Sequence, residues 1–166
     1  MMKKLLVIIG TSLVALMLVV GARADGGGGG GGNERDSKEL KEARTLIKKE
    51  DYAAAVPLLE TVIAEEPKSA DAHNWMGYAQ RNLGNYELSK AHYEQALQID
   101  PKHRGALEYY GELHLKMDNL AAAEDLLERL DKTCWFGCEE FDELEDRKST
   151  RLNSSHSSVS RMPSSA

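Results

Sequence analysis

The two cysteines are the residues whose spacing most directly suggests chemistry. Cys134 and Cys138 enclose Trp135, Phe136 and Gly137. Cysteines this close tend to pair in an oxidising compartment, and Gly137 permits a tight loop between them. Because so small a ring restricts the unfolded chain only slightly, we expect a disulfide that fixes the loop and adds little stability. Redox catalysts usually have a shorter spacing, so a thiol-redox protein using Cys134 and Cys138 is the weakest interpretation.

No other set of side chains forms a recognisable catalytic or metal-binding pattern. Two thiols are too few for a metal site, and no histidine lies at a suggestive spacing from them. The sequence has no Ser–His–Asp arrangement, and its Gly-rich tract lacks the strand and helix that a phosphate-binding loop requires. We therefore expect a protein that is not an enzyme and holds no cofactor or metal. The histidines outside the C-terminal segment are scattered: His73, His92, His103 and His114.

The chain is strongly acidic once its two unusual ends are set aside. Residues 25–145 contain 14 Lys and Arg and 26 Asp and Glu, a net charge of −12, against −6 for the whole sequence. Nucleic-acid binding depends on clustered Lys and Arg, so a nucleic-acid partner is excluded. Anionic membrane surfaces would repel the domain. A protein or peptide partner remains, and nothing indicates a small-molecule substrate.

The N-terminus has the pattern of a bacterial secretory signal. Lys3 and Lys4 precede an apolar stretch, residues 5–20, and Ala22-Arg23-Ala24 provides a small-x-small cleavage site. We predict cleavage after Ala24 and a periplasmic or secreted protein. The alternative is an uncleaved anchor in the inner membrane that faces the periplasm, although the apolar run is shorter than the roughly 20 residues of a spanning helix. Residues 25–35 contain seven consecutive glycines, Gly26 to Gly32, and predict a flexible leader.

The C-terminal segment, residues 146–166, differs in composition from everything before it. It is rich in serine and has no apolar periodicity. The string DRKSTRLNSSH resembles the translation of a common short-read sequencing adapter, and SRMPSSA resembles the next constant adapter segment. We therefore expect an artefactual, disordered tail and a native C-terminal sequence that is not represented here.

Between these ends the sequence repeats with a constant period, which is the mark of a helical repeat protein. The predicted units are 36–69, 70–103 and 104–134. In the central unit we predict helices over 71–83 and 86–99, joined by a turn at Gly84-Asn85 and ended by Pro101. A capping box of Asp36 and Glu39 is expected to start the first helix. Four registers show the period in three units: Tyr52, Tyr86 and Leu120; Ala55, Ser89 and Ala123; Leu59, Tyr93 and Leu127; and Ala43, Gly77 and Gly111.

The repeat resembles the tetratricopeptide repeat. The resemblance covers residues 36 to about 134 and implies an all-α fold, a right-handed superhelical stack of antiparallel helix pairs with about three units. Small Gly77 and Ala96 would lie where two helices approach closely, beside the larger Tyr86 and Tyr93. A truncated capping helix is expected in 135–145, short or frayed, with Phe141 and Leu144 facing inward. The motif positions that match in the central unit are Met76-Gly77, Gly84, Tyr86, Ser89, Tyr93, Ala96 and Pro101.

In this family the first helix of each unit lines a concave surface that contacts extended peptides or helices of partners. The resemblance thus implies a non-catalytic interaction module or scaffold of the bacterial envelope. The alternative is a membrane-anchored structural subunit of an envelope assembly. The positions carried over are Leu40, Arg44, Ile47, Lys48, Asn74, Tyr78, Arg81, Asn82, Glu108, Glu112, Leu115 and Lys116. The expected groove residues among them are Arg44, Lys48, Asn74, Tyr78, Arg81, Asn82, Glu112 and Lys116.

Overall fold

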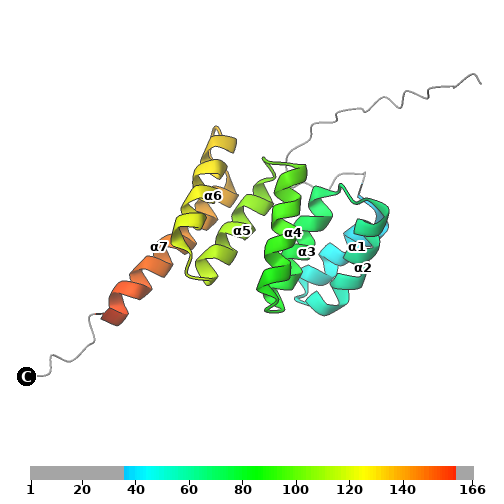
Figure 1. Ribbon diagram of the computed structural model, residues 1–166, viewed down its shortest axis with the longest axis horizontal. Coiled ribbons are helices and arrows are strands. Elements are labelled where there is room, and N and C mark those ends of the chain that lie inside the picture. Colours follow the sequence, from blue (N-terminus) through cyan, green and yellow to red (C-terminus); the bar gives the residue numbers. More distant parts are fainter. Residues whose placement is uncertain (1–35, 160–166) are drawn as a thin grey trace, which may run out of the picture.

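The computed structural model describes residues 36–159, and helices follow one another along all of them without a strand. The predicted signal and Gly-rich leader, residues 1–35, lie outside the described residues. Figure 1 shows the helices crossing the molecule in chain order, from cyan to red. The elements are α1 Lys38–Lys48, α2 Tyr52–Glu65, α3 Ala70–Asn82, α4 Tyr86–Ile99, α5 Arg104–Lys116, α6 Leu120–Thr133 and α7 Glu139–Val159.

The helices pack as antiparallel pairs, α1 with α2, α3 with α4 and α5 with α6, and each pair contacts the next. The expected fold, an all-α stack of tetratricopeptide-type helix pairs, is confirmed. In the central unit the two helices lie within one residue of their predicted bounds. The turn inside each pair contains one residue of positive φ, at Glu50, Gly84 and Asp118, and these positions are again separated by the repeat period.

The start of α1 differs from the expected capping box. Ser37 is the N-cap residue, and its hydroxyl accepts a hydrogen bond from the Leu40 amide at 3.1 Å. Asp36 instead accepts a hydrogen bond from the guanidinium of Arg44, eight residues further along the chain, at 2.6 Å. Because Ser37 caps the helix by accepting from the Leu40 amide, the Asp36 carboxylate is available for the guanidinium.

The interior consists of two apolar clusters. One is formed by α1, α2 and α3 around Leu59 and Met76, and the other by α4 to α7 around Leu107 and Leu130. The two meet where the Tyr93 ring lies against Gly77, which is the close helix approach that the repeat pattern predicted. Ser89 strengthens this contact because its hydroxyl donates to the Gly77 carbonyl at 2.7 Å.

The last helix is longer than expected. Phe141 and Leu144 face α5 and α6 as predicted, and Leu144 is fully buried. The prediction of a short or frayed cap was wrong, because α7 continues to Val159 and includes residues expected to be disordered. Arg147 pairs with Glu112, and Arg151 pairs with Asp118 in the α5–α6 turn. These ion pairs hold a polar helix that has few apolar residues of its own to bury.

Candidate functional site

The inner wall of the stack is formed by α1, α3 and α5, which contact one another in succession. Half-buried aromatic rings lie along it. The Tyr78 ring lies 4.8 Å from the Tyr109 ring and 6.0 Å from Trp75, between ring centroids. Tyr52 approaches Tyr78 from the start of α2, at 6.1 Å. We call Tyr52, Trp75, Tyr78 and Tyr109 the aromatic wall. Such edge-to-face packing leaves part of each ring open to a ligand.

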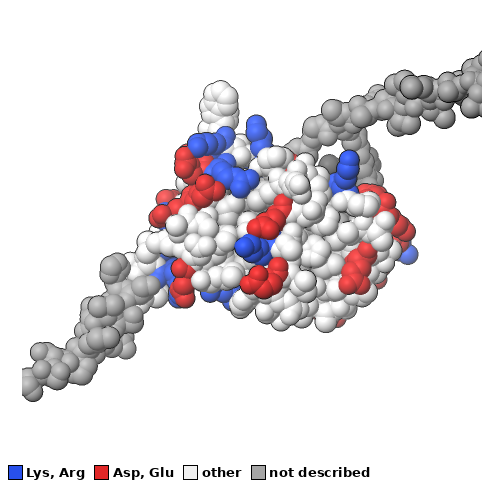
Figure 2. Space-filling view, viewed as in Figure 1, with Lys and Arg blue, Asp and Glu red and all other residues white. Residues whose placement is uncertain are grey.

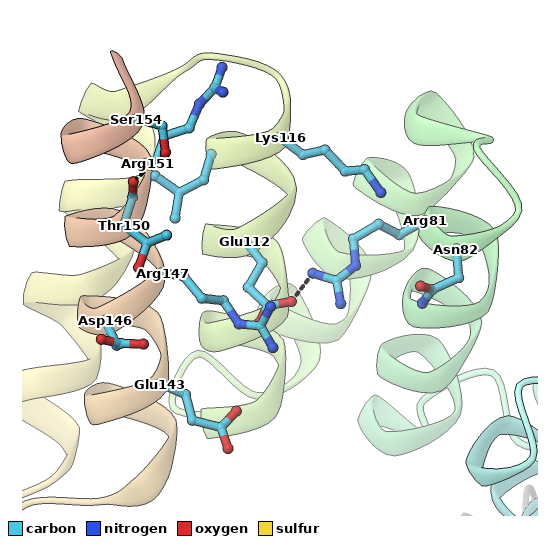
Figure 3. A pocket seen from close by; sticks show the side chains of 11 residues that line it. Arg81, Asn82, Glu112, Lys116, Glu143, Asp146, Arg147, Thr150, Arg151 and Ser154 are labelled. Atoms are coloured by element: carbon cyan, nitrogen blue, oxygen red, sulfur yellow. Dashed lines mark hydrogen bonds and ion pairs between the residues drawn. The ribbon is translucent and has the colours of Figure 1, made fainter. Parts of the chain in front are cut away.

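Arg81 joins two neighbouring units beneath this wall. Its guanidinium lies 5.0 Å from the Tyr78 ring centroid and 5.6 Å from that of Tyr109, which places it between two electron-rich faces. It forms an ion pair with Glu112 of α5 and also donates to the Tyr109 carbonyl at 3.4 Å. Figure 3 shows Arg81 reaching from α3 towards Glu112, which Arg147 of α7 approaches from the other side.

Two hollows lie on the inner wall, and rings of the aromatic wall line the smaller of them. A cavity of about 210 Å³, the small cavity, lies between α1, α3, α5 and the start of α7. A wider hollow of about 740 Å³, the large groove, lies between α3, α5 and α7 (Figure 3). The small cavity is lined by Arg44, Lys48, Asp71, Asn74, Trp75, His103, Gly105, Glu108, Tyr109 and Glu140. The large groove is lined by Arg81, Asn82, Glu112, Leu115, Lys116, Glu143, Asp146, Arg147, Thr150, Arg151 and Ser154.

The expected groove residues all lie on this inner wall, but three of them are not open side chains. Asn74, Arg81 and Glu112 are only 2%, 8% and 7% exposed. Arg81 borders the large groove, but it does not offer a free guanidinium there, because α5 covers it and Glu112 neutralises it. Buried charges of this kind persist only when paired. Four further carried-over positions are also buried, although Glu108 contributes to the lining of the small cavity and Leu115 to that of the large groove: Leu40, Ile47, Glu108 and Leu115.

The remaining expected residues are more accessible. Lys48 is exposed at the edge of the small cavity, and Arg44 lies over the Trp75 ring at 5.5 Å. Lys116 is exposed beside the large groove, with its ammonium 5.6 Å from the Tyr86 ring centroid. Asn82 is exposed, and its amide donates to the Tyr78 carbonyl at 2.9 Å. The open part of the wall is thus aromatic with basic edges.

The sequence interpretation missed Trp75 and Tyr109, although the signal was present. They are one repeat period apart and so occupy the same position in successive units. His103 was also missed: its Nδ1 accepts from the Ala106 amide at the start of α5, while its Nε2 donates to Asp71 at the start of α3, at 3.1 Å. This hydrogen bond lowers the pKa of the Asp71 carboxyl.

Three carboxylates, those of Glu108, Glu112 and Glu143, are the closest approach to a metal-ligand set in the described part of the chain, with oxygens within 4.8 Å of one another. Their chemistry does not fit a resident cation. Burial and the hydrogen bond with Glu143 raise the pKa of Glu108 to about 9, so this group is protonated near neutral pH. Glu112 is already neutralised by Arg81. The cluster is better described as carboxyls that share a proton.

The disulfide expected between Cys134 and Cys138 is present, with the two Cα atoms 5.6 Å apart. It closes the connection between α6 and α7. Both cysteines pack at the edge of the second apolar cluster. Within residues 36–159, the helices are all too short or too polar to span a bilayer.

Comparison with known proteins agrees with this architecture. Family models of the tetratricopeptide repeat match residues 40–103 and 83–133, which together exceed half of the chain. The chain is 30% identical over 90 residues to tetratricopeptide repeat protein 1 of Schizosaccharomyces pombe. That match covers 52% of this chain but only 9% of the relative's length.

Two solved structures show the same fold at low sequence identity. The Sgt2 tetratricopeptide domain of Aspergillus fumigatus superposes with a TM-score of 0.66 at 16% identity, over 78% of this chain and 85% of that one. The type III secretion chaperone SycD of Yersinia enterocolitica was solved in complex with a peptide of the translocator YopD. It superposes with a TM-score of 0.60 at 21% identity, over 74% of this chain and 95% of that one. From the repeat matches and the helix-pair stack together, the chain belongs to the tetratricopeptide repeat family.

Proposed function

We propose that the protein is a non-catalytic interaction module of the bacterial envelope that binds a peptide segment or helix of a partner protein on its inner wall. The observation that supports this most directly is the aromatic wall, whose half-buried rings Trp75 and Tyr109 line the small cavity. Rings held in place by neighbours offer apolar contact area at a small cost in conformational entropy. The similar SycD structure contains a bound peptide, which is the class of ligand that we propose here.

The small cavity supplies the polar half of this binding surface. The Asn74 Oδ1 is buried there and accepts no hydrogen bond from the described residues. Buried acceptors usually have a donor, and a backbone N–H of an extended peptide is a suitable one. Arg44 and Lys48 at the cavity edge favour a carbonyl or carboxylate on the same ligand. This combination favours an extended peptide with an apolar side chain on the rings and acceptor groups near α1.

The test uses one variant of the binding wall and one matched control. Tyr78→Ala/Lys48→Glu removes a ring and reverses an exposed charge, whereas Leu88→Ala/Lys102→Glu makes the same type of change on α4 and the loop after it. Arg81 is left intact because its removal would leave Glu112 buried without its partner. Crosslinking and affinity capture from envelope extract should lose the specific partners with the first variant only, by about tenfold or more.

Thermal unfolding of each variant separates lost binding from lost folding. We expect the variant of the binding wall to melt below the control, because the Tyr78 ring packs against Trp75, Tyr109 and Arg81, and both variants to be folded at the temperature of the capture experiment. Equal recovery of partners by both folded variants would contradict binding on the inner wall.

The location is part of the proposal. We propose that residues 1–24 are a secretory signal cleaved after Ala24, and that the domain acts in the periplasm, where the disulfide would form. A protein that retains the signal would instead be the anchored structural subunit, and N-terminal sequencing of the mature protein distinguishes the two. We also propose that residues 146–166 come from a sequencing adapter. The aromatic wall and the small cavity do not include them.

A further inference from the structure

The loop between α6 and α7 presents two aromatic side chains at the corners of a closed turn. The Gly137 amide donates to the Cys134 carbonyl at 3.1 Å, so residues 134–137 form a hydrogen-bonded β-turn. The disulfide from Cys134 to Cys138 closes the same segment covalently. Gly137 has a φ of +82°, a conformation that favours glycine. Trp135 and Phe136 occupy the two central positions of this turn, where side chains project away from the body of the protein.

These rings are the most exposed large apolar side chains among the described residues. Trp135 is 89% exposed and Phe136 is 97% exposed. Their rings are stacked on each other, with centroids 6.3 Å apart and planes 19° from parallel. The cysteines and Phe141 pack on the core beside them, so the loop is fixed at its base and open at its tip. In Figure 2 the α6–α7 connection forms a white protrusion above a charged surface.

This exposure has no explanation in the stability of the fold. Two exposed aromatic rings gain nothing from burial and add an aggregation liability, which soluble proteins retain mainly at interaction sites. Tryptophan and phenylalanine are also the kinds of side chain that act as anchors when a partner encloses them. The disulfide holds both anchors in one arrangement before binding, which lowers the entropy that a partner must remove.

The charges around the loop indicate the kind of partner. On the α7 side of the loop, residues 139–145 contain five carboxylates and no Lys or Arg, while on the α6 side Lys132 is paired with Glu128. Three of them, Glu139, Asp142 and Glu143, line a hollow beside Phe136 and Gly137. An acidic border attracts a basic partner surface and is repelled by anionic lipid.

We propose that the Trp135–Phe136 turn is a second docking site, which binds the apolar stripe of a basic amphipathic helix in a partner protein. Such a helix offers an apolar strip for the two rings, and the Lys and Arg residues along its borders meet Glu139, Asp142 and Glu143. The site is separate from the aromatic wall and does not depend on peptide binding there.

The test uses the full chain and defined probes. The probes are a helical peptide of Leu and Lys at amphipathic spacing and its Leu and Glu counterpart. Vesicles of neutral phosphatidylcholine, and of phosphatidylcholine mixed with anionic phosphatidylglycerol, test for a membrane. The sequence has two tryptophans, so Trp75→Phe leaves Trp135 as the only tryptophan reporter. We expect the Leu/Lys peptide alone to shift the Trp135 emission to shorter wavelength.

Affinity is then measured with a fluorescently labelled Leu/Lys peptide. Trp135→Ala/Phe136→Ala keeps every charge and should weaken binding by about 30-fold or more, as expected for hot-spot residues. The control Leu83→Ala/Leu88→Ala removes two other exposed apolar side chains and should change binding by less than about twofold. Cys134→Ser/Cys138→Ser should weaken binding by about three- to tenfold, since the rings remain but are no longer held in place.

Three results would overturn the proposal. Equal binding by the Trp135→Ala/Phe136→Ala variant would show that only the net charge attracts the peptide. An equal response to the Leu/Glu peptide would remove the role of the acidic border. An emission shift with either vesicle, without one for the Leu/Lys peptide, would assign the turn to a membrane surface. Because neither ring packs in the core, Trp135→Ala/Phe136→Ala is expected to melt as the parent chain does.

Discussion

Gly77 and Gly111 occupy the same position in successive units, yet different parts of the chain pack on them. A methyl group on Gly77 would lie 2.7 Å from two atoms of the Tyr93 ring, which comes from the second helix of the same unit. A methyl group on Gly111 would lie 2.5 Å from Cδ2 of Leu144, which comes from α7. The repeat pattern thus specifies a small residue at each seam, whereas the side chain that fills the space comes from a different helix in each unit.

The two regions also bury different ionisable groups. At the α3–α4 seam, Nδ1 of His73 lies 3.1 Å from Nδ1 of His92, and burial lowers the pKa of both rings. At the α5–α7 seam, burial raises the pKa of Glu108. The buried histidines are stable in their neutral form, which is lost in acid, whereas buried Glu108 is stable in its neutral form, which is lost in base. The stabilities of the two seams therefore change with pH in opposite directions.

The largest expected difference between the seams comes from filling the two glycines. Gly77→Ala should cost about 2 kcal/mol, because the Tyr93 ring is rigid and fully buried and cannot move aside. Gly111→Ala should cost less than about 1 kcal/mol, because the end of the flexible Leu144 side chain can rotate and alanine favours the helix. Urea unfolding followed by circular dichroism measures both values. A loss at Gly111 as large as that at Gly77 would remove the distinction between the seams.

The α5–α7 seam should lose stability in base. The pKa of Glu108 is about 9 in the folded protein and 4.5 as its ordinary value. Its contribution is therefore fully present below about pH 4.5 and is lost as the pH rises through about 9. Glu108→Gln keeps the neutral form, so we expect its free energy of unfolding to exceed that of the parent chain by at least about 1 kcal/mol more at pH 9 than at pH 5.

The matched control is Glu145→Gln, an exposed carboxylate of α7. Its free energy of unfolding should differ from that of the parent chain by the same amount at pH 5 and at pH 9. A Glu108→Gln effect that does not grow with pH would show that this carboxyl ionises normally in the folded protein.

The α3–α4 seam should lose stability in acid. This is the smallest of the three changes in stability expected for the two seams. Because burial depresses the folded-state pKa of His73 and His92 below their ordinary 6.5, the stabilisation is present above that pH and is lost as the pH falls. His73 also donates from Nε2 to the Pro67 carbonyl at 3.3 Å, which partly opposes the shift. The expected loss between pH 7.5 and 5.5 is less than about 1 kcal/mol. A titration of the two rings by NMR with midpoints at or above 6.5 would contradict this assignment.

Much of the fold was accessible from the sequence because the constant repeat period fixes both helix lengths and seam positions. It predicted α3 and α4 and the Gly84 turn, while the spacing of Phe141 and Leu144 predicted their inward direction. The period does not report how closely the next unit covers a side chain. For that reason Asn74, Arg81 and Glu112 were expected on an open groove and are buried. The length of α7 depends on ion pairs with α5 and the turn after it, which no local pattern records.

The ion pair between Arg81 and Glu112 makes the inner wall unequal along its length. It ties α3 to α5 through a buried guanidinium that also contacts two rings, so these units present one stiff surface. At the other end, Arg44 is paired with Asp36 in the segment before α1, and Lys48 is exposed. A bound segment would contact fixed side chains at the α3–α5 end of the wall and more adaptable side chains at the α1 end. The fixed end would then contribute most to affinity, and the adaptable end would allow different ligand sequences to bind.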